Sequence, residues 1–275
     1  MRSHSVLPGL FGILLFATLS CGGNSQPAEG PTGGGAAGAG DTSTSSSGGG
    51  VGGSSSGSDG TTSCDGTPGG AVALPGVGNV RHTGGLPTAG GSCVKDNVLI
   101  RSGHLADLDS AGCAALEALS IQTVIDMRAL GGSTGSGANP DADCVTTGTN
   151  YYNADVVKLL PPTADSYLQT LDAAEPKLAE IYSRLGTDDS LPAVIHCVIG
   201  RDRASLMMAV VLLSIGVSAA DVVDDFVNNQ EATVEAAWLQ AAIDQIESEG
   251  GIDTYLQSHG VTAAQIDKLK ALAIE

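Results

Sequence analysis

The sequence predicts an α/β fold with three layers, in which a central and mainly parallel sheet is flanked by helices. Short apolar runs of strand character alternate with longer segments whose apolar residues recur at helical spacing. The stretch Val194-Ile195-His196-Cys197 is a buried-type strand that continues through a glycine-containing turn into an apolar helix. In such folds the carboxyl ends of the strands form the binding edge, so we expect the site there.

The predicted strands are short and apolar. They cover residues 98–103, 121–127, 149–154 and 191–196. A segment rich in glycine and proline over residues 75–88 predicts an irregular entry into the domain, and residues 131–144 predict a loop.

The predicted helices cover residues 107–120, 165–185, 204–215, 219–229, 233–247 and 262–273. Either Asp107 or Asp109 suits the N-cap of the first. Pro176 must kink the second or start a new helix there. Residues 204–215 are apolar almost all round, which indicates a buried central helix rather than a membrane span.

The chain is strongly acidic, with 275 residues, a net charge of -18 and a pI near 4.3. This charge argues against nucleic acid as a partner and against electrostatic docking on an anionic membrane. Aromatic residues make up only 3%, which disfavours stacking platforms for bases or sugars. An anionic ligand would therefore have to be attracted by local positive groups rather than by the overall charge.

Residues 1–21 predict a signal peptide, because a basic start precedes an apolar run too short to span a bilayer. Ser20-Cys21-Gly22 resembles a bacterial lipoprotein cleavage site, at which Cys21 would be lipidated. Thr18 stands where such sites usually have leucine, so plain secretion is the alternative. We expect an exported, membrane-anchored lipoprotein that faces the periplasm or the cell surface and touches the membrane only through its lipid.

Residues 22–63 consist mainly of Gly, Ser, Thr and Ala, which cannot bury a core. They predict a disordered tether whose ends lie roughly 35 Å apart on average. The remaining residues, 64–275, form the predicted catalytic domain. They are numerous enough for one α/β core.

Four cysteines remain if Cys21 is lipidated and Cys197 is a nucleophile, and in an exported chain four cysteines suggest two disulfides. Three pairings are possible, of which Cys64–Cys93 and Cys113–Cys144 are favoured because each would clip a loop to its neighbour. Metal binding is the rival interpretation, but none of the cysteines is spaced like a zinc ligand pair, so we expect no metal and no cofactor.

Cys197 and Arg203 enclose a Cys-x5-Arg loop with Gly200 inside it. The layout suits cysteine-based phosphoryl transfer, because backbone N–H groups and a helix N-terminus can surround one tetrahedral anion. Arg203 could bind two phosphate oxygens, and Cys197 would lie beneath the phosphorus as a thiolate. The structural alternative is an inert buried cysteine in an ordinary strand–helix turn.

Four stretches in this order resemble the bacterial tyrosine phosphatases of the mycobacterial protein tyrosine phosphatase B type. They are Asn79-Val80-Arg81, Leu99-Ile100-Arg101-Ser102-Gly103, Thr123-Val124-Ile125-Asp126-Met127-Arg128 and His196-Cys197-Val198-Ile199-Gly200-Arg201-Asp202-Arg203. Asp224-Asp225-Phe226 and residues 251–256 are similar to the family's C-terminal helices. The resemblance covers roughly residues 74–274. It implies the cysteine-phosphatase fold and metal-free hydrolysis of phosphotyrosine, with phosphoserine, phosphothreonine and phosphoinositides as further candidates.

By the same resemblance, Cys197 is the nucleophile and Arg203 binds the phosphate. His196 matches a histidine that helps to keep the thiolate ionised, although a core histidine explains it equally well. The residues expected around the substrate are His196, Val198, Ile199, Gly200, Arg201 and Asp202. Asp202 is expected to orient the loop rather than to donate a proton.

A leaving phenolate or alkoxide needs a proton, so a general acid is expected. Asp155 is the candidate, because it follows the predicted strand 149–154 and precedes the motif cysteine. Asp165 is the second choice. Asp188 and Asp189 lie too close to the motif strand.

Two residues depart from the family pattern. Ala204 stands where a Ser or Thr hydroxyl usually helps the phosphocysteine to break down, which predicts slower turnover. His82 stands where the entry motif usually has an aspartate, which could change packing or substrate preference. A non-catalytic phosphoryl-binding module is therefore the main alternative to an enzyme. A sulfur-transfer or arsenate-reducing loop is a more distant one.

Overall fold

The computed structural model describes residues 64, 69–129, 140–157, 160–228, 231 and 233–275. The predicted signal peptide, the tether and Cys21 lie outside these residues. Within the described part of the chain, no helix combines the length and the apolar character that crossing a membrane requires.

Five strands form one sheet, in the order β1-β2-β5-β3-β4. They are β1 (Arg81–His82), β2 (Leu99–Ser102), β3 (Thr123–Asp126), β4 (Asn150–Asn153) and β5 (Ala193–His196). Every pair is parallel except β1 with β2. The last residues of β2 and β3, Ser102 and Asp126, both align with His196 of β5, so the carboxyl ends of these strands form one edge.

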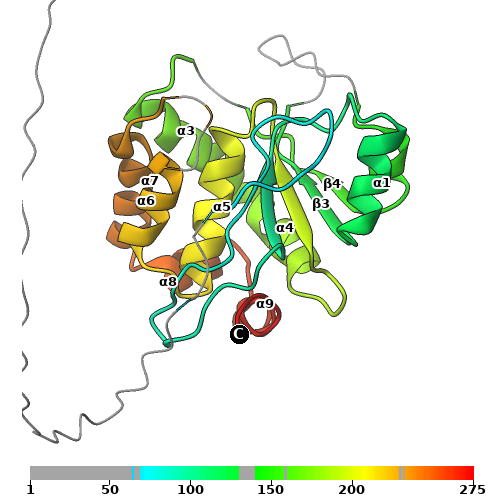
Figure 1. Cartoon of the computed structure of the whole chain (residues 1–275). Coiled ribbons are helices and arrows are strands. Elements are labelled where there is room, and N and C mark those ends of the chain that lie inside the picture. The colour runs from blue at the N-terminus through cyan, green and yellow to red at the C-terminus, as the bar shows by residue number, and fades with distance from the viewer. Residues whose placement is uncertain (1–63, 65–68, 130–139, 158–159, 229–230, 232) are drawn as a thin grey trace, which may run out of the picture. The chain divides into compact units, whose positions relative to one another are not determined.

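Helices cover both faces of the sheet (Figure 1). They are α1 (Ser110–Ala118), α2 (Asp143–Thr146), α3 (Ala164–Ala174), α4 (Leu178–Leu185), α5 (Arg203–Ser214), α6 (Ala219–Asn228), α7 (Ala236–Ser248), α8 (Ile252–Ser258) and α9 (Ala263–Ala273), with a 3-10 turn η1 (Glu175–Lys177) between α3 and α4. Alternate strand residues face opposite layers: Ile125 and Ile195 join the core with α3 to α9, and Val124 and Val194 join the core with α1. The predicted three-layer α/β fold is confirmed.

The structure differs from the sequence prediction in a few elements. Residues 131–144 were expected to be loop, but α2 begins at Asp143. Pro176 lies in the 3-10 turn that separates α3 from α4, because proline cannot donate the hydrogen bond of a continuous helix. Asp109, rather than Asp107, caps α1 by accepting from two backbone N–H groups. A short helix, α8, stands between the last two predicted helices.

The buried central helix is α5, in which all twelve residues from Arg203 to Ser214 are buried. Its first residue is the motif arginine. Its far end meets the entry segment, where Ala89 donates to Gly216 at 2.8 Å and Thr88 bridges Val217.

Two disulfides join Cys64 to Cys93 and Cys113 to Cys144, which are the favoured pairings. Among the described cysteines, Cys197 alone has a free thiol. Cys93 also exchanges both backbone hydrogen bonds with the C-terminal Glu275, at 3.0 and 2.9 Å. The segment that leads into the domain is thereby fastened to the last residue of the chain.

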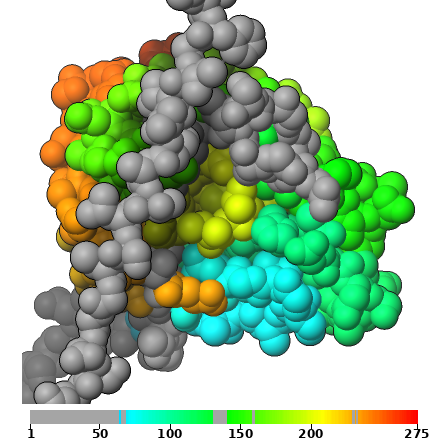
Figure 2. Space-filling model, turned by 90° about the horizontal axis from the view of Figure 1, so that it is seen from above, coloured from blue at the N-terminus to red at the C-terminus, as the bar shows by residue number. Residues whose placement is uncertain are grey.

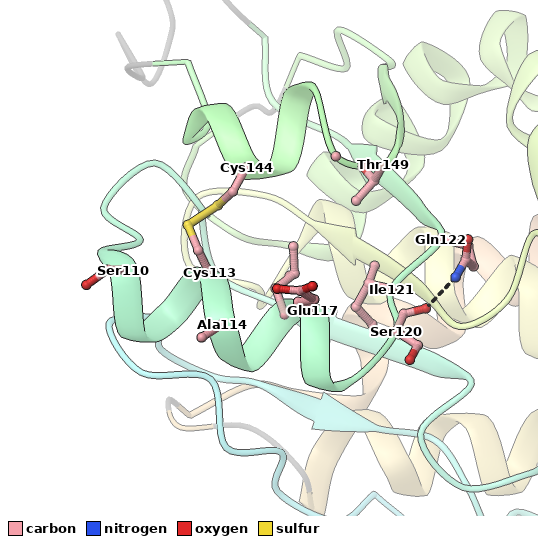
Figure 3. A pocket seen from close by; sticks show the side chains of 11 residues that line it. Ser110, Cys113, Ala114, Glu117, Ser120, Ile121, Gln122, Cys144 and Thr149 are labelled. Atoms are coloured by element: carbon pink, nitrogen blue, oxygen red, sulfur yellow. Dashed lines mark hydrogen bonds between the residues drawn. A yellow bond between two sulfur atoms is a disulfide. The ribbon is translucent and has the colours of Figure 1, made fainter.

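The Cys113–Cys144 disulfide borders a surface pocket of about 710 Å³ between α1 and the start of β4 (Figure 3). Glu117, Ser120 and Thr149 also line it. The lining runs along α1 from Ser110, continues to Ser120 and reaches Thr149, which precedes β4. Both cysteines of the disulfide are half-buried.

Candidate active site

The loop from Cys197 to Arg203 lies at the carboxyl edge of the sheet, between the end of β5 and the start of α5. Figure 2 looks down on this edge and shows yellow residues of this region between the cyan entry segment and the green part of the chain. Gly200 has a φ of +69°, in the left-handed region that favours glycine. Within the described residues, the amide N–H groups of Val198, Ile199, Gly200 and Arg201 have no protein acceptor.

The carbonyl groups of the same loop are held from outside. Val198 accepts from the His104 amide at 3.0 Å, and Ile199 accepts from the Asn79 side chain at 3.0 Å. The Gly200 oxygen accepts from the guanidinium of Arg101. Since the two ends of a peptide group point in opposite directions, outward carbonyls leave the amides directed toward the centre of the loop. This arrangement is an anion-binding nest.

Arg203 is anchored by one nitrogen and has others to spare. Nη1 donates to the Val156 carbonyl at 3.0 Å and to the Met127 carbonyl at 3.3 Å, which follow the ends of β4 and β3. Its Nε is buried and has no acceptor in the described part of the chain. A buried N–H without a partner is costly, so the guanidinium is preorganised for an oxyanion in the loop.

The carboxylate of Asp202 accepts hydrogen bonds from two neighbouring side chains of the protein. Its Oδ1 accepts from Tyr167 of α3 and from the Nε of its neighbour Arg201, both at 3.1 Å. Burial and the charge of Asp202 raise the pKa of Tyr167, so the phenol stays a donor. These contacts support the expectation that Asp202 orients the loop. The predicted contact of Arg201 with substrate stays a prediction.

His196, the residue before Cys197, lies in a fully buried cluster. Its Nδ1 is 3.3 Å from the carbonyl oxygen of Cys197, and its Nε2 is 3.0 Å from Oδ2 of Asp141. Asp126, the last residue of β3, lies 3.7 Å from the same Nε2. The ring therefore faces this cluster, and its expected roles toward the thiolate and the substrate stay predictions.

Arg128 supplies the fixed positive charge of this cluster. Its Nε donates to Asp126 at 2.8 Å, and its Nη2 pairs with Asp141 at 2.8 Å. Burial alone would raise the pKa of Asp126, but the hydrogen bond from Arg128 and the charges of His196 and Arg128 outweigh burial and lower that pKa. Asp126, Asp141 and His196 are residue types that bind metals, and their donor atoms converge. Because the guanidinium already bridges both carboxylates, we assign no metal to them.

Residues 72–275 match the family model described as "Tyrosine phosphatase family". The chain belongs to the tyrosine phosphatase family. A "Tyrosine-protein phosphatase" of Nostoc commune is 23% identical over 152 residues, which make up 51% of this chain and 51% of that relative. The match thus spans about half of the relative's length.

Two solved phosphatase structures are more distantly similar. The core catalytic domain of the PP-IP phosphatase SIW14 from S. cerevisiae, in complex with citrate, is 13% identical, covers 68% of this chain and 98% of its own, and has a TM-score of 0.40. PTPMT1 in complex with PI(5)P is 16% identical, covers 64% and 90%, and has a TM-score of 0.29. TM-scores this low do not support a comparison of individual residues.

The tyrosine phosphatase reaction needs a proton donor, and Asp155 lies two residues after the end of β4. It is exposed, with a φ of +50°, between the buried residues Ala154 and Val156. The Val156 carbonyl accepts from Arg203, so Asp155 adjoins the residue that anchors Arg203. This position agrees with the proposed acid, and the role itself stays a prediction. Asp165 lies in the first turn of α3.

The structure shows the surroundings of Ala204 and His82, the two residues that depart from the family pattern. Ala204 is fully buried, and the hydroxyl of Ser205 donates to the Gly200 carbonyl at 3.3 Å. Ser205 therefore supports the loop from beneath. His82 accepts the Gly84 amide through Nδ1 at 3.0 Å, as a carboxylate could. The entry turn thus keeps an acceptor despite the change.

Sequence reasoning missed Arg101 as a loop support and Asp141 as a partner of His196. Arg101, Asp126 and Arg128 lie in stretches that resemble the family, but nothing in the spacing shows what they bind. Asp141 follows a segment rich in glycine and has no local signal. Its contacts become apparent only when the fold brings together the residues at or just after the ends of β2, β3 and β5.

Proposed function

We propose that this chain is an exported, lipid-anchored phosphatase that hydrolyses phosphomonoesters through a phosphocysteine on Cys197. The observation that carries the proposal is the loop itself. Inward amides and the unpartnered Nε of Arg203 surround a space next to a free thiol, at the N-terminus of a buried helix. Membership of the tyrosine phosphatase family supports the same chemistry.

In the first step, the Cys197 thiolate attacks phosphorus, an S–P bond forms, and the P–O bond to the leaving group breaks. Asp155 gives its proton to the leaving oxygen. In the second step, the Asp155 carboxylate takes a proton from water, whose oxygen attacks phosphorus, and the S–P bond breaks to release phosphate. Arg203 and the loop amides stabilise the equatorial oxygens throughout.

Phosphotyrosine is the first substrate we propose, with phosphoserine, phosphothreonine and phosphoinositides as alternatives. The apolar side chain of Ile199 projects from the loop and is 47% exposed. Val157, next to the residue that anchors Arg203, is 41% exposed. Apolar groups beside the loop favour an aromatic leaving group over a charged sugar ring.

Export and anchoring rest on separate features. The residue pattern of the first 63 positions supports a signal peptide, lipidation of Cys21 and a tether. The two disulfides support an oxidising compartment. Intact-mass measurement of the mature protein tests this part, because lipidation adds acyl chains to a chain that starts at Cys21. A mature protein that keeps residues 1–20 contradicts it.

The catalytic proposal is tested with purified protein, an aryl phosphate and a metal chelator. We expect phosphate release that is lost on Cys197→Ser, with a phosphorylated Cys197 trapped by rapid acid quench. Arg203→Lys is the companion variant, because a lysine keeps the charge but cannot bridge two phosphate oxygens. Activity that survives Cys197→Ser would refute the mechanism. Assays with and without mild reductant reveal oxidation of the thiol.

A phosphoryl-binding module without turnover is the second candidate, favoured by Ala204 in place of the usual hydroxyl. It predicts that a phosphopeptide binds while no phosphate is released, even in reductant. The gain variant Ala204→Thr separates the two. Faster breakdown of the phosphocysteine in that variant supports a slow enzyme, and no phosphocysteine in either protein supports a binding module.

A further inference from the structure

We propose that Asp141 is a positioning residue, which holds His196 as a doubly protonated ring directly behind Cys197. The inference rests on the proposed function and adds to it a residue that no motif identifies. Asp141 is 4% exposed and precedes α2 by two residues. It acts on the reaction through His196 and touches no substrate.

The acceptors around the imidazole determine its protonation. Nδ1 faces the Cys197 carbonyl at 3.3 Å, and Nε2 faces Oδ2 of Asp141 at 3.0 Å. The Cys197 carbonyl can only accept hydrogen bonds, and so can Asp141 while its carboxyl group is ionised. A neutral imidazole has one nitrogen without hydrogen, and that lone pair would face an oxygen in a fully buried position. With Asp141 ionised, a hydrogen on each ring nitrogen suits both oxygens, and the Nε2–Oδ2 contact is then an ion pair at 3.0 Å rather than a hydrogen bond of good direction.

The charges of the cluster lead to the same conclusion. Two carboxylates, Asp126 and Asp141, face one guanidinium, Arg128, and all three side chains have zero exposure. Among the described residues, the Tyr151 phenol donates to Asp126 at 2.8 Å, and its pKa is raised by burial and by Asp126. The neutral side chain of Asn153 donates to the backbone carbonyls of Asp126 and Arg128. With a neutral histidine the cluster would hold an uncompensated negative charge, which is costly in a buried site.

Asp141, rather than Asp126, is the dedicated partner of the ring. Both oxygens of Asp126 already accept from Arg128 or Tyr151. In Asp141, Oδ1 accepts from the Leu105 amide at 3.1 Å and pairs with Arg128, which leaves Oδ2 for His196. The Cys113–Cys144 disulfide fastens the chain three residues further on. Contacts with the segments that follow β2 and β3, together with the disulfide to α1, therefore hold Asp141 in place beside the ring.

The first experiment observes the ring itself. Full-length protein labelled with ¹⁵N-histidine is examined by two-bond ¹H–¹⁵N correlation at pH 7, and His196 is assigned with His196→Gln. We expect both ring nitrogens of His196 to show the shifts of protonated nitrogen. In Asp141→Asn the side-chain amide can donate to Nε2, so one nitrogen should lose its hydrogen. A wild-type spectrum with one unprotonated nitrogen overturns the proposal, even if the variant does not fold.

The second experiment observes the sulfur. Iodoacetamide alkylation of Cys197 at pH 7, followed by peptide mass mapping, should be about 10-fold slower in Asp141→Asn, since a charge-assisted contact is lost. The matched control is Asp143→Asn, which removes the same charge from an exposed position two residues away. Simple loosening of the fold would expose the buried thiol and make alkylation faster. An equal or faster rate in Asp141→Asn therefore contradicts the proposal.

Neither readout depends on turnover, so the two proposals can fail separately. If the ring and the alkylation behave as expected but no phosphate is released, the phosphatase function falls and the placement of charge stands. If phosphate is released through Cys197 while Asp141→Asn changes neither the ring nor the alkylation rate, the positioning role falls and the phosphatase function stands.

Discussion

The guanidinium of Arg101 donates to the carbonyl oxygen of Gly200, inside the loop from Cys197 to Arg203. Arg101 comes from β2 and is 1% exposed, so this is a buried cation at the base of that loop. Burial lowers its pKa, while the charges of Asp225 and Cys197 oppose that shift. The loop is therefore supported by one arginine at its base and completed by another, Arg203, at its end.

Replacing Arg101 with methionine should cost about 3–5 kcal/mol of unfolding free energy, because the buried Asp225 loses the positive charge of Arg101. Activity should fall as well, because the Gly200 carbonyl loses its charged donor. Urea unfolding and kcat/KM measure the two effects. The control is Arg184→Met, at a partly exposed ion pair with Glu180, which should change stability by under about 1 kcal/mol. Equal losses in the two variants would contradict the structural role.

Gly200→Ala should abolish phosphate binding. A Cβ there would lie 2.6 Å from the carbonyl carbon of Ser102 and 2.7 Å from the amide of Gly103, so backbone would have to move. Gly216→Ala is the control, since its φ of +98° imposes similar strain while the nearest atom would be 3.7 Å away. Both variants should lose about 1–2 kcal/mol from left-handed strain. Only Gly200→Ala should lose vanadate binding in titration calorimetry, and binding that survives in it argues against an inward-facing loop.

Asp155→Asn should slow hydrolysis of phenyl phosphate by about 10²-fold or more, since the leaving phenolate would lack its proton. The loss should shrink with aryl phosphates whose phenols are more acidic, because those leave without a proton. A leaving-group series under single-turnover conditions measures this. Asp165→Asn, in the first turn of α3, is the matched control. A steeper leaving-group dependence in Asp165→Asn would indicate that Asp165, and not Asp155, is the general acid.

The two disulfides close chain segments of nearly equal length, with separations of 29 and 31 residues. Removing either with a pair of serines should therefore cost a similar free energy, about 3.6 kcal/mol on the chain-entropy model. Their effects on activity should differ. Cys113→Ser with Cys144→Ser frees the segment that carries Asp141, so kcat should fall. Cys64→Ser with Cys93→Ser should leave kcat near wild type. Equal kcat values in the two double variants would show that the disulfide at α2 does not affect the site.

Stability should decline in acid through Asp126. Its pKa is lowered in the folded protein, so its contribution is present above the unfolded value of about 3.9 and is lost as pH falls further. Asp126→Asn should therefore be much less stable than wild type at pH 7, with a smaller gap at pH 3. Chemical unfolding at both values measures this. Asp244→Asn, on the exposed side of α7, should follow the wild-type curve, and a constant gap for Asp126→Asn would exclude the linkage.

Local patterns were enough to predict most of the fold. Alternation of short apolar runs with helical segments gave the parallel sheet, and the uniform apolarity of residues 204–215 gave the central helix. The Cys-x5-Arg spacing indicated the loop, because its strand, turn and helix are contiguous in the chain. Prediction was weaker at short elements such as α2, where four residues offer little periodicity.

The supports of the site were not predictable for a different reason. Asp141 meets Leu105, Arg128 and His196, which come from three separate strand ends. Such a position depends on sheet order, and sheet order places β5 between β2 and β3 although it is last in sequence. The direction of the Ser205 hydroxyl, toward Gly200 rather than the sulfur, depends likewise on how α5 begins.

Cys93 is joined to Cys64 by a disulfide and to Glu275 by two backbone hydrogen bonds, so the two ends of the domain lie close together. Both ends of the domain emerge near the far end of α5, and the catalytic loop lies at its beginning, about 18 Å away along the helix axis. A molecule held at residue 64 would thus be attached at the end of α5 that is opposite to the loop. Substrates on soluble molecules or on a facing surface would meet the loop from its free side, whereas lipids of the anchoring leaflet would meet it only after the domain rotates about its attachment.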